Sequence, residues 1–412
     1  MDKPVSLTSP GESAPAGPPP RPKPSHRRMA LILGSLTAFG PLAIDTYLPS
    51  FPAISRERGV APSSVQVTVA VYFLGLAVGQ VFYGPVADRW GRKRPLYAGL
   101  LLFILASVGC ALARSIDALT LLRLLQALGG SAQMVIARAV VRDYFDQHES
   151  ARVLSLLMLV MGVAPILAPL LGGQLVALFG WRSIFWALAA SAALCLAAVH
   201  LVLEESLPPE ARRRGGFAMI LRTYGSLLAS RSFTAHVLAG SLIVAGMFAY
   251  IAGSPFVFME IFGVSPQRFG LFFGTNALGL IAASQVNARL VRRFGPAGIL
   301  RVLLIVAAAA GLALLATAAT GLGGFPGTLV PLFLFVSSLG FISPNATALA
   351  MASQGRNAGS ASAVLGTIAF LGGGAASGLV SALYDGTAMP MALVIAACGL
   401  GALAVHLLLG RR

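Results

Sequence analysis

Long apolar runs alternate with short polar segments along almost the whole chain. A helix rises about 1.5 Å per residue, so about 20 apolar residues cross the roughly 30 Å hydrocarbon core of a bilayer. Twelve runs reach that length, with approximate limits at residues 29–50, 66–86, 95–114, 117–142, 151–178, 182–203, 234–259, 268–290, 297–320, 326–349, 357–383 and 387–409. The fourth, fifth, ninth and tenth runs have the least distinct boundaries.

The pattern inside the runs predicts helices. None of the runs alternates apolar and polar residues as a strand of a membrane barrel does. In lipid, only helices and closed barrels satisfy the hydrogen bonds of the backbone. The sequence therefore predicts an all-α membrane protein with twelve transmembrane helices.

An internal repeat divides these helices into two halves. The segment GLAVGQVFYGPVADRWGRKRPL aligns with GLIAASQVNARLVRRFGPAGIL, so that Gly91 falls on Gly295 and Asp88 falls on Arg292. The expected organisation is a disordered cytoplasmic tail at 1–27, six-helix halves at 28–203 and 234–412, and a cytoplasmic linker at 204–233. Transporters built from repeats place their substrate site near the bilayer midplane, between the repeats.

Composition and charge agree with a membrane protein. The chain is 57% hydrophobic and only 11% charged, whereas a soluble domain is about 25% charged. The net charge of +16 would suit a nucleic-acid binder, but the basic residues lie in short clusters between apolar runs. With the N-terminus inside, 24 of the 30 Lys and Arg residues fall on the inner side, which predicts cytoplasmic termini and no nucleic-acid partner.

No chemistry of an enzyme or a cofactor is evident. Cys110, Cys195 and Cys398 lie inside apolar runs without the spacing of a metal site, which predicts a structural role. The chain has no nucleotide-binding loop of the Walker type, so ATP hydrolysis would need another subunit. We expect no cofactor, no metal and no enzymatic activity.

The loop segment GPVADRWGRKRP concentrates four positive charges and one carboxylate between the second and third predicted helices. Basic residues on the inner side hold topology, but topology alone does not explain a carboxylate between two glycines. Asp88 can pair with Arg92, four residues on, and its charge suits the positive N-terminal end of a neighbouring helix.

This segment resembles the signature of the major facilitator superfamily. More narrowly, the chain resembles the Bcr/CflA drug-resistance exporters in the stretches AIDTYLPSFPAI, RLLQALGGSAQMVIARAVVRDYF, APILAPLLGG, IAGSPFVFMEIFGVSPQ, ISPNATALAM and AGSASAVLG. The resemblance implies an efflux antiporter in the bacterial inner membrane. It also implies a conformational latch, carried by the matching residues Gly84, Asp88, Arg89, Gly91 and Arg92.

The fifth predicted helix contains GVAPILAPLLGG. In it, Pro165, Pro169, Gly172 and Gly173 match a motif associated with antiporters in this superfamily, although Ala168 stands where the family usually has Gly. Glycine and proline at this density allow close packing and a bend, which would suit a hinge. Glycine is also common in membrane helices of every kind, so the motif favours export only moderately.

Two charged residues lie within the apolar runs, the acidic Asp45 and the basic Arg123. Helical rise places them at a similar depth in the outer half of the bilayer. A lone charge costs at least about 2.5–3.5 kcal/mol at the helix centre, so we expect them to face a shared cavity or each other. A structural ion pair is one interpretation. We favour a carboxylate that gains and loses a proton in each cycle, with Arg123 promoting proton release.

Four other polar side chains are candidates for the substrate cavity: Tyr47, Tyr250, Asn276 and Asn345. Hydrogen bonding between helices explains such residues equally well. The prolines at 49 and 52 can also simply end the first helix.

The predicted function is proton-coupled efflux of small, partly apolar compounds of the amphenicol, sulfonamide or bicyclomycin type. The expected partners are the drug-like substrate, protons and the lipid bilayer, and two halves in one chain suggest a monomer. A proton-coupled transporter of an endogenous metabolite or peptide, in either direction, is the alternative. A sensor that transports nothing is a second alternative. Such a protein would tolerate loss of Asp45 and Arg123.

Overall fold

The computed structural model describes residues 26–145, 147–212, 217–352, 354–355 and 358–409, and every regular element within these ranges is helical. Most of the predicted tail, residues 1–25, lies outside the described residues. The first half holds α1 (His26–Asp45), η1 (Leu48–Ser50), α2 (Phe51–Arg58), α3 (Pro62–Trp90), α4 (Lys93–Leu112), α5 (Ile116–Tyr144), α6 (Gln147–Phe179) and α7 (Arg182–Val202). The remaining elements are η2 (Pro209–Ala211), α8 (Phe217–Ala229), α9 (Arg231–Phe256), η3 (Val257–Ile261), α10 (Pro266–Thr320), α11 (Gly324–Met351), α12 (Ala358–Ala382) and α13 (Met389–Leu409).

Among the described residues, eleven helical segments are long and apolar enough to cross a membrane, and one of them supplies two crossings. That segment is α10, whose 55 residues are interrupted at Gly295, where φ is 68° and ψ is 160°. The parts of α10 on either side of Gly295 correspond to the eighth and ninth predicted runs. The predicted all-α fold with twelve spans is therefore confirmed.

The repeat in the sequence is also a repeat in backbone conformation. Gly91, between α3 and α4, has φ 89° and ψ 171°, close to the values at Gly295 in α10. Positive φ combined with extended ψ is accessible almost only to glycine. Each half therefore turns from its second to its third crossing on a glycine that no other residue type could replace without strain.

The first crossing is interrupted near its middle. α1 ends at Asp45, a short 3₁₀ turn follows, and α2 continues the same crossing to Arg58. Pro49 and Pro52 lie in the first two positions of the elements that follow the break, where the missing N–H of proline costs no hydrogen bond. The prolines therefore restart the helix after Asp45 and do not end it at the interface.

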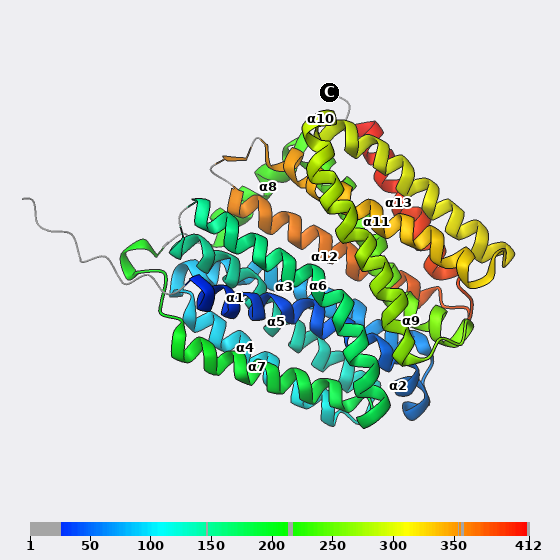
Figure 1. The fold of residues 1–412 in the computed structure, drawn as a ribbon. Helices are drawn as coiled ribbons and strands as arrows, with labels where there is room; N and C mark the ends of the chain where they lie inside the picture. Colours follow the sequence, from blue (N-terminus) through cyan, green and yellow to red (C-terminus); the bar gives the residue numbers. More distant parts are fainter. Residues whose placement is uncertain (1–25, 146, 213–216, 353, 356–357, 410–412) are drawn as a thin grey trace, which may run out of the picture.

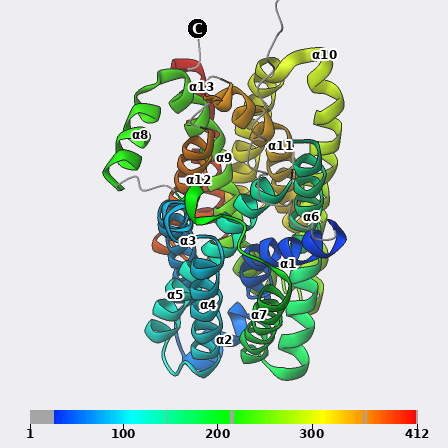
Figure 2. The ribbon, with the colours of Figure 1, turned by 90° about the vertical axis from the view of Figure 1, so that its left-hand side faces the viewer.

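The two halves pack side by side (Figures 1 and 2). The contacts between them come mainly from two helix pairs, α3 with α12 and α6 with α10. α2 lies at one end of the bundle, and α8 lies near the other (Figure 1). We call the first the Glu57 end and the second the Asp88 end, after one residue at each. The residue boundaries predicted for the two halves stay a prediction.

Close contacts seal the Glu57 end between the halves. The Ser381 hydroxyl on α12 donates a hydrogen bond of 2.7 Å to the backbone carbonyl of Ser63 on α3. On the other side, a Cβ at Gly173 of α6 would meet the backbone of Pro266, and one at Gly270 of α10 would meet that of Leu170. Neither approach leaves room for a side chain.

Close packing of helix backbones can be tested where α4 crosses α5 within the first half. A Cβ at Gly129 would lie 2.6 Å from the backbone oxygen of Gly99 and from the backbone nitrogen of Phe103. Gly129→Val should lower the free energy of unfolding by about 1–3 kcal/mol because the backbones must separate. Thermal unfolding of the purified protein in detergent measures the loss. Gly298→Val is the matched control, since no atom lies within 4 Å of a Cβ there. Equal losses in both variants would contradict the packing argument.

Candidate functional site

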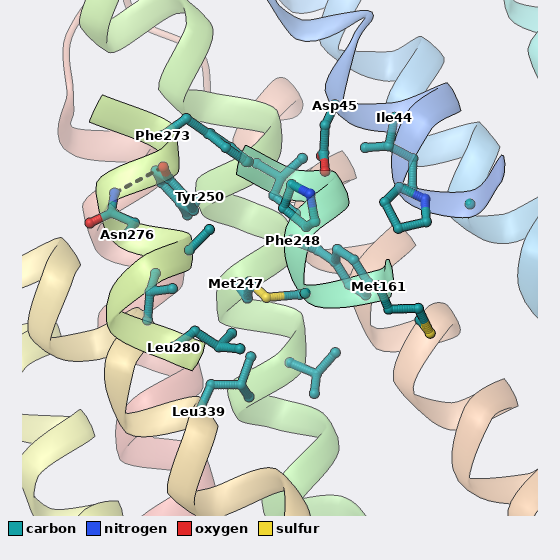
Figure 3. Close-up of a pocket in the computed structure, with 18 of the residues that line it drawn as sticks. Ile44, Asp45, Met161, Met247, Phe248, Tyr250, Phe273, Asn276, Leu280 and Leu339 are labelled. Atoms are coloured by element: carbon teal, nitrogen blue, oxygen red, sulfur yellow. Dashed lines mark hydrogen bonds between the residues drawn. The ribbon is translucent and has the colours of Figure 1, made fainter. Parts of the chain in front are cut away.

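A cavity of about 320 Å³ lies between the two halves, and both halves contribute to its wall (Figure 3). Aliphatic, aromatic and methionine side chains make most of this wall, among them Met134, Met161 and Phe248. The polar side chains that line it are Asp45, Tyr250, Asn276 and Ser343. Such a surface binds apolar compounds by burial and orients them with few hydrogen bonds. We call it the central cavity.

Asp45 supplies the negative charge of the central cavity. It is the last residue of α1, its residue surface is only 4% exposed, and its carboxylate points toward the cavity (Figure 3). None of the described residues gives it a hydrogen bond or an ion pair. An ionised carboxylate in such a place is costly, and a protonated one or one paired with a ligand is not.

Arg123 lies behind α1 and does not line the central cavity. Its Nη1 donates to the backbone carbonyl of Ala43 at 3.0 Å and to Oε1 of Gln126 at 2.5 Å. The guanidinium carbon lies 4.1 Å from the ring centroid of Tyr72 and 4.6 Å from that of Tyr47, an arrangement that stabilises a buried cation. Its Nε and Nη2 have no hydrogen-bond partner among the described residues.

Asp45 and Arg123 thus do not form an ion pair. The contact with Ala43 brings Arg123 to a point two residues before Asp45 on α1, in line with the similar depth predicted for them. Asp45 faces the cavity as expected, whereas Arg123 is fully buried within the first half. Sequence spacing gave the depth of both residues but not the direction of either side chain.

The central cavity contains two of the four predicted polar residues. Tyr250 and Asn276 line it, and the Asn276 amide donates to the Tyr250 hydroxyl at 2.9 Å (Figure 3). The amide oxygen of Asn276 is buried and has no partner among the described residues.

The other two polar residues lie outside the cavity wall, which corrects their predicted place. Tyr47 forms a buried hydrogen bond of 3.0 Å with Thr68 and packs over Arg123. Asn345 donates to the side-chain oxygen of Asn287 at 2.7 Å. Both join neighbouring helices, because a buried polar group that finds a partner across an interface is satisfied there.

The motif on α6 runs from the central cavity toward the Glu57 end. Pro165 lines the cavity, and Pro169 is buried one turn further along. Beyond it, Gly172 packs against the backbone of Thr46 and Gly173 against that of Pro266. The helix stays continuous through both prolines. Gly173 therefore lies in the seal between the halves, whereas Gly172 forms a close contact within the first half.

A second cavity, of about 400 Å³, opens at the Asp88 end between the two halves. Gly84 and Asp88 line it from α3, Arg138 and Arg142 from α5, and the first turn of α12 lies opposite. We call this second cavity the vestibule. The exposed Arg89 lies outside its wall.

Arg92 connects two carboxylates beside the vestibule. Its Nη1 donates to Asp88 at 2.6 Å, which is the pairing predicted from the sequence, and its Nε donates to Asp143 at 2.8 Å. Burial lowers the pKa of Arg92, but the hydrogen bonds that Arg92 donates to Asp143 and Asp88 outweigh burial and raise this pKa above its usual range. The network therefore carries a permanent positive charge with two negative partners.

Glu205 completes this network, and the sequence analysis missed it. Its carboxylate accepts hydrogen bonds from the backbone N–H of Arg92 at 2.8 Å and of Lys93 at 3.1 Å. These groups open α4, so Glu205 caps that helix and compensates its positive end. Gly91 admits the carboxylate, because a Cβ there would lie 2.5 Å from Glu205 Oε2. No local signal marks a cap that comes from a distant part of the chain.

Loss of this cap should be measurable. Glu205→Ala should lower the free energy of unfolding by about 1 kcal/mol, because two N–H groups at the start of α4 lose their acceptor. Glu204→Ala removes the same charge one residue earlier, where the side chain has no hydrogen bond or ion pair with any described residue, and should have little effect. Equal thermal unfolding midpoints for the two variants would contradict the capping role.

The arrangement is that of a binding cavity. Within the described residues, no group of three or more His, Cys, Asp or Glu side chains could hold a metal ion. The features brought together are an apolar space between two halves, a lone carboxylate in it, and a charged network at one end of the bundle. Such features allow a small molecule to enter from one end and a proton to bind beside it.

Comparison with known proteins gives a consistent family. The model of the Major Facilitator Superfamily matches residues 33–377. An uncharacterized MFS-type transporter of Bacillus subtilis, YdgK, is 38% identical over 89% of this chain and 91% of its own length. A bicyclomycin resistance protein homolog of Haemophilus influenzae is 33% identical over 89% of this chain and 92% of its own length.

A solved structure has the same fold. The xylose transporter XylE from E. coli, in a partially occluded inward-open conformation, superimposes with a TM-score of 0.70. The match covers 93% of this chain and 97% of XylE at 14% sequence identity, so it extends to the arrangement of the helices alone.

Proposed function

Because this chain belongs to the major facilitator superfamily, a family of membrane transporters and not of enzymes, we propose that it exports small, partly apolar compounds in exchange for protons. One observation carries the proposal: the unpaired carboxylate of Asp45 lies in an otherwise apolar cavity between two halves. The bicyclomycin resistance homolog among its relatives supports a drug-like substrate. Amphenicols, sulfonamides and bicyclomycin-like compounds all fit a cavity of this character.

The proposed orientation follows from the distribution of basic residues. Most Lys and Arg residues lie in segments at the Asp88 end, which would be cytoplasmic together with both termini. The Glu57 end would then face outward across the inner membrane of a bacterium. In this orientation the conformation is closed to the outside and has its vestibule on the cytoplasmic side.

The proposed cycle uses the cost of a buried charge. Protonation of Asp45 from the outside removes that cost and lets the two halves rock so that the cavity faces inward. A substrate entering from the cytoplasm then favours loss of the proton by occupying the cavity. Arg123 keeps a fixed positive charge near α1 and makes the ionised carboxylate less costly, so that release can occur.

The Asp88 network would act as the latch of this cycle. Asp88 lies across the vestibule from α12, and its carboxylate is bonded to Arg92 on its own side. Closure of the vestibule would bring the positive N-terminal end of α12 toward Asp88. Gly84 leaves space for that approach, because no atom lies within 4 Å of a Cβ there. Gly91 instead makes room for the Glu205 carboxylate, and Arg89 adds positive charge at the membrane surface.

Transport in everted membrane vesicles tests the proposal. Respiration acidifies such vesicles, and a substrate of a proton antiporter dissipates the gradient as it enters. We expect at least one amphenicol, sulfonamide or bicyclomycin-like compound to cause dissipation that depends on this protein. A compound that moves together with protons would favour the uptake alternative, and no response across the panel would contradict drug–proton exchange.

A further inference from the structure

The vestibule has an excess of positive charge. Arg138 and Arg142 are four residues apart on α5, so both project from the same side of the helix into the vestibule. Both residues are exposed, and neither has a carboxylate partner among the described residues. The hydrogen bond of Arg138 is to the carbonyl of Met134 in its own helix, at 3.1 Å.

The carboxylates nearby are already engaged. Asp88 and Asp143 both accept hydrogen bonds from Arg92, and Glu205 caps the start of α4. Ser206 also donates to Asp143, at 2.8 Å. These three carboxylates therefore have partners of their own, and none of them forms an ion pair with Arg138 or Arg142.

The opposite wall adds further positive potential. α12 begins at Ala358, and its first backbone N–H groups, which have no partner within the helix, carry the positive end of the helix dipole. A Cβ at Gly359 would lie 3.8 Å from Nη1 of Arg142, so the guanidinium lies beside this helix end. Ser360 and Ser362 line the same wall and offer hydroxyl donors.

Two positive groups that face each other across a gap repel, and an anion between them removes the repulsion. We propose that the vestibule binds a phosphate group between the Arg138–Arg142 pair and the start of α12. Guanidinium groups bind phosphate through paired N–H donors, and a helix N-terminus accommodates it with backbone N–H groups. The same chemistry fits free inorganic phosphate and the headgroup of an anionic lipid.

Binding there would affect the conformational equilibrium. Arg142 belongs to the first half and α12 to the second, so one phosphate group would connect the halves across the open vestibule. It would also neutralise the helix end that Asp88 would otherwise approach. A bound phosphate should therefore stabilise the conformation that is open at the Asp88 end, since a ligand favours the state it binds best.

Phosphate titration of the full-length protein in detergent gives the first test. Inorganic phosphate should raise the unfolding temperature in a saturable way, beyond chloride at matched ionic strength. Arg142→Gln and Arg138→Gln should each weaken the apparent affinity by about tenfold, which is the usual effect of losing one charge-assisted hydrogen bond. Arg292→Gln, an equal charge loss on α10 outside the vestibule, should leave the affinity unchanged.

A second measurement distinguishes the source of the phosphate. The protein is placed in nanodiscs of phosphatidylglycerol or of phosphatidylcholine. Native mass spectrometry then releases the protein from the nanodisc and counts the lipid molecules that stay bound to it. Arginine-dependent retention of phosphatidylglycerol, with no effect of inorganic phosphate, would identify a lipid headgroup, and the reverse would identify a soluble anion. Phosphate effects equal to those of chloride, combined with lipid retention that Arg138→Gln and Arg142→Gln leave unchanged, would overturn the proposal. Neither measurement requires drug transport, so this proposal can fail independently of the proposed function.

Discussion

Asp45→Asn is expected to abolish drug-dependent proton movement while the protein stays folded. Asparagine keeps the size of the side chain but does not gain or lose a proton at physiological pH. An ionised carboxylate at this depth costs at least about 2.5–3.5 kcal/mol, and protonation of Asp45 removes that cost. Without this difference between two protonation states, substrate-triggered proton release should fall by about a hundredfold, because each 1.4 kcal/mol is a factor of about ten.

The measurement compares proton release from purified wild-type and Asp45→Asn protein on addition of drug in weakly buffered detergent. Asp117→Asn, at the exposed start of α5, removes the same charge outside the central cavity and should behave as wild type. The unfolding temperature supplies a second readout. Because Asp45 has no partner among the described residues, the Asn variant should be at least as stable as wild type.

Each outcome for Asp45 has a distinct meaning. Equal proton release from both proteins would show that another group carries the proton. A large fall in stability, with proton release intact, would assign Asp45 a structural role. Release lost at unchanged stability is what the geometry of the central cavity predicts.

Gly173→Val is expected to hold the Glu57 end open. A Cβ at this position of α6 would meet the backbone of Pro266 at the start of α10, where no flexible side chain can move aside. Overpacking of this kind costs about 1–3 kcal/mol. The cost falls on the conformation in which the two halves touch, so the variant should shift the equilibrium by a factor of about 5–30 or more toward the outward-open conformation.

Labelling of a single introduced cysteine measures that shift. Ser343→Cys places a thiol in the wall of the central cavity, and the native Cys110, Cys195 and Cys398 are buried. A membrane-impermeant maleimide is added outside whole cells. It should label this thiol faster in the Ser343→Cys protein that also carries Gly173→Val than in the Ser343→Cys protein without Gly173→Val. Drug export should fall in parallel, because the closed conformation of the Glu57 end is a necessary step of the cycle.

Gly378→Val on α12 is the matched control for this experiment. It introduces the same branched side chain into a membrane helix, and no atom lies within 4 Å of a Cβ there. Labelling and export should match those of the wild type. Unchanged labelling in Gly173→Val would show that α6 and α10 adjust without opening, and the proposed seal would then be wrong.

The sequence predicts much of the fold because the bilayer imposes local rules. Every span must satisfy its own backbone within about 20 residues, so hydrophobic run length alone indicates a crossing. The repeat was equally readable, since Gly91 and Gly295 are required by local backbone geometry at equivalent turns. The pairing of Asp88 with Arg92 was also predicted from the sequence, although the two residues lie on either side of the turn at Gly91 and not within one helix.

Other features depend on contacts between distant segments. Glu205 caps a helix that begins more than a hundred residues earlier, and no nearby pattern indicates it. Tyr47 and Asn345 resemble cavity residues in the sequence, but partners on neighbouring helices satisfy them. Arg123 has the predicted depth, yet the rings of Tyr47 and Tyr72 hold it away from the cavity.

The sequence by itself determined the number of crossings, the twofold repeat, and the two charged residues that lie within the membrane. The tertiary structure alone decided that Asp45 faces an apolar cavity while Arg123 does not, and that two arginines without a carboxylate partner among the described residues face the start of α12. The reason is physical. Run length and backbone conformation are set within one segment, whereas the direction and partner of a side chain depend on how several segments pack together.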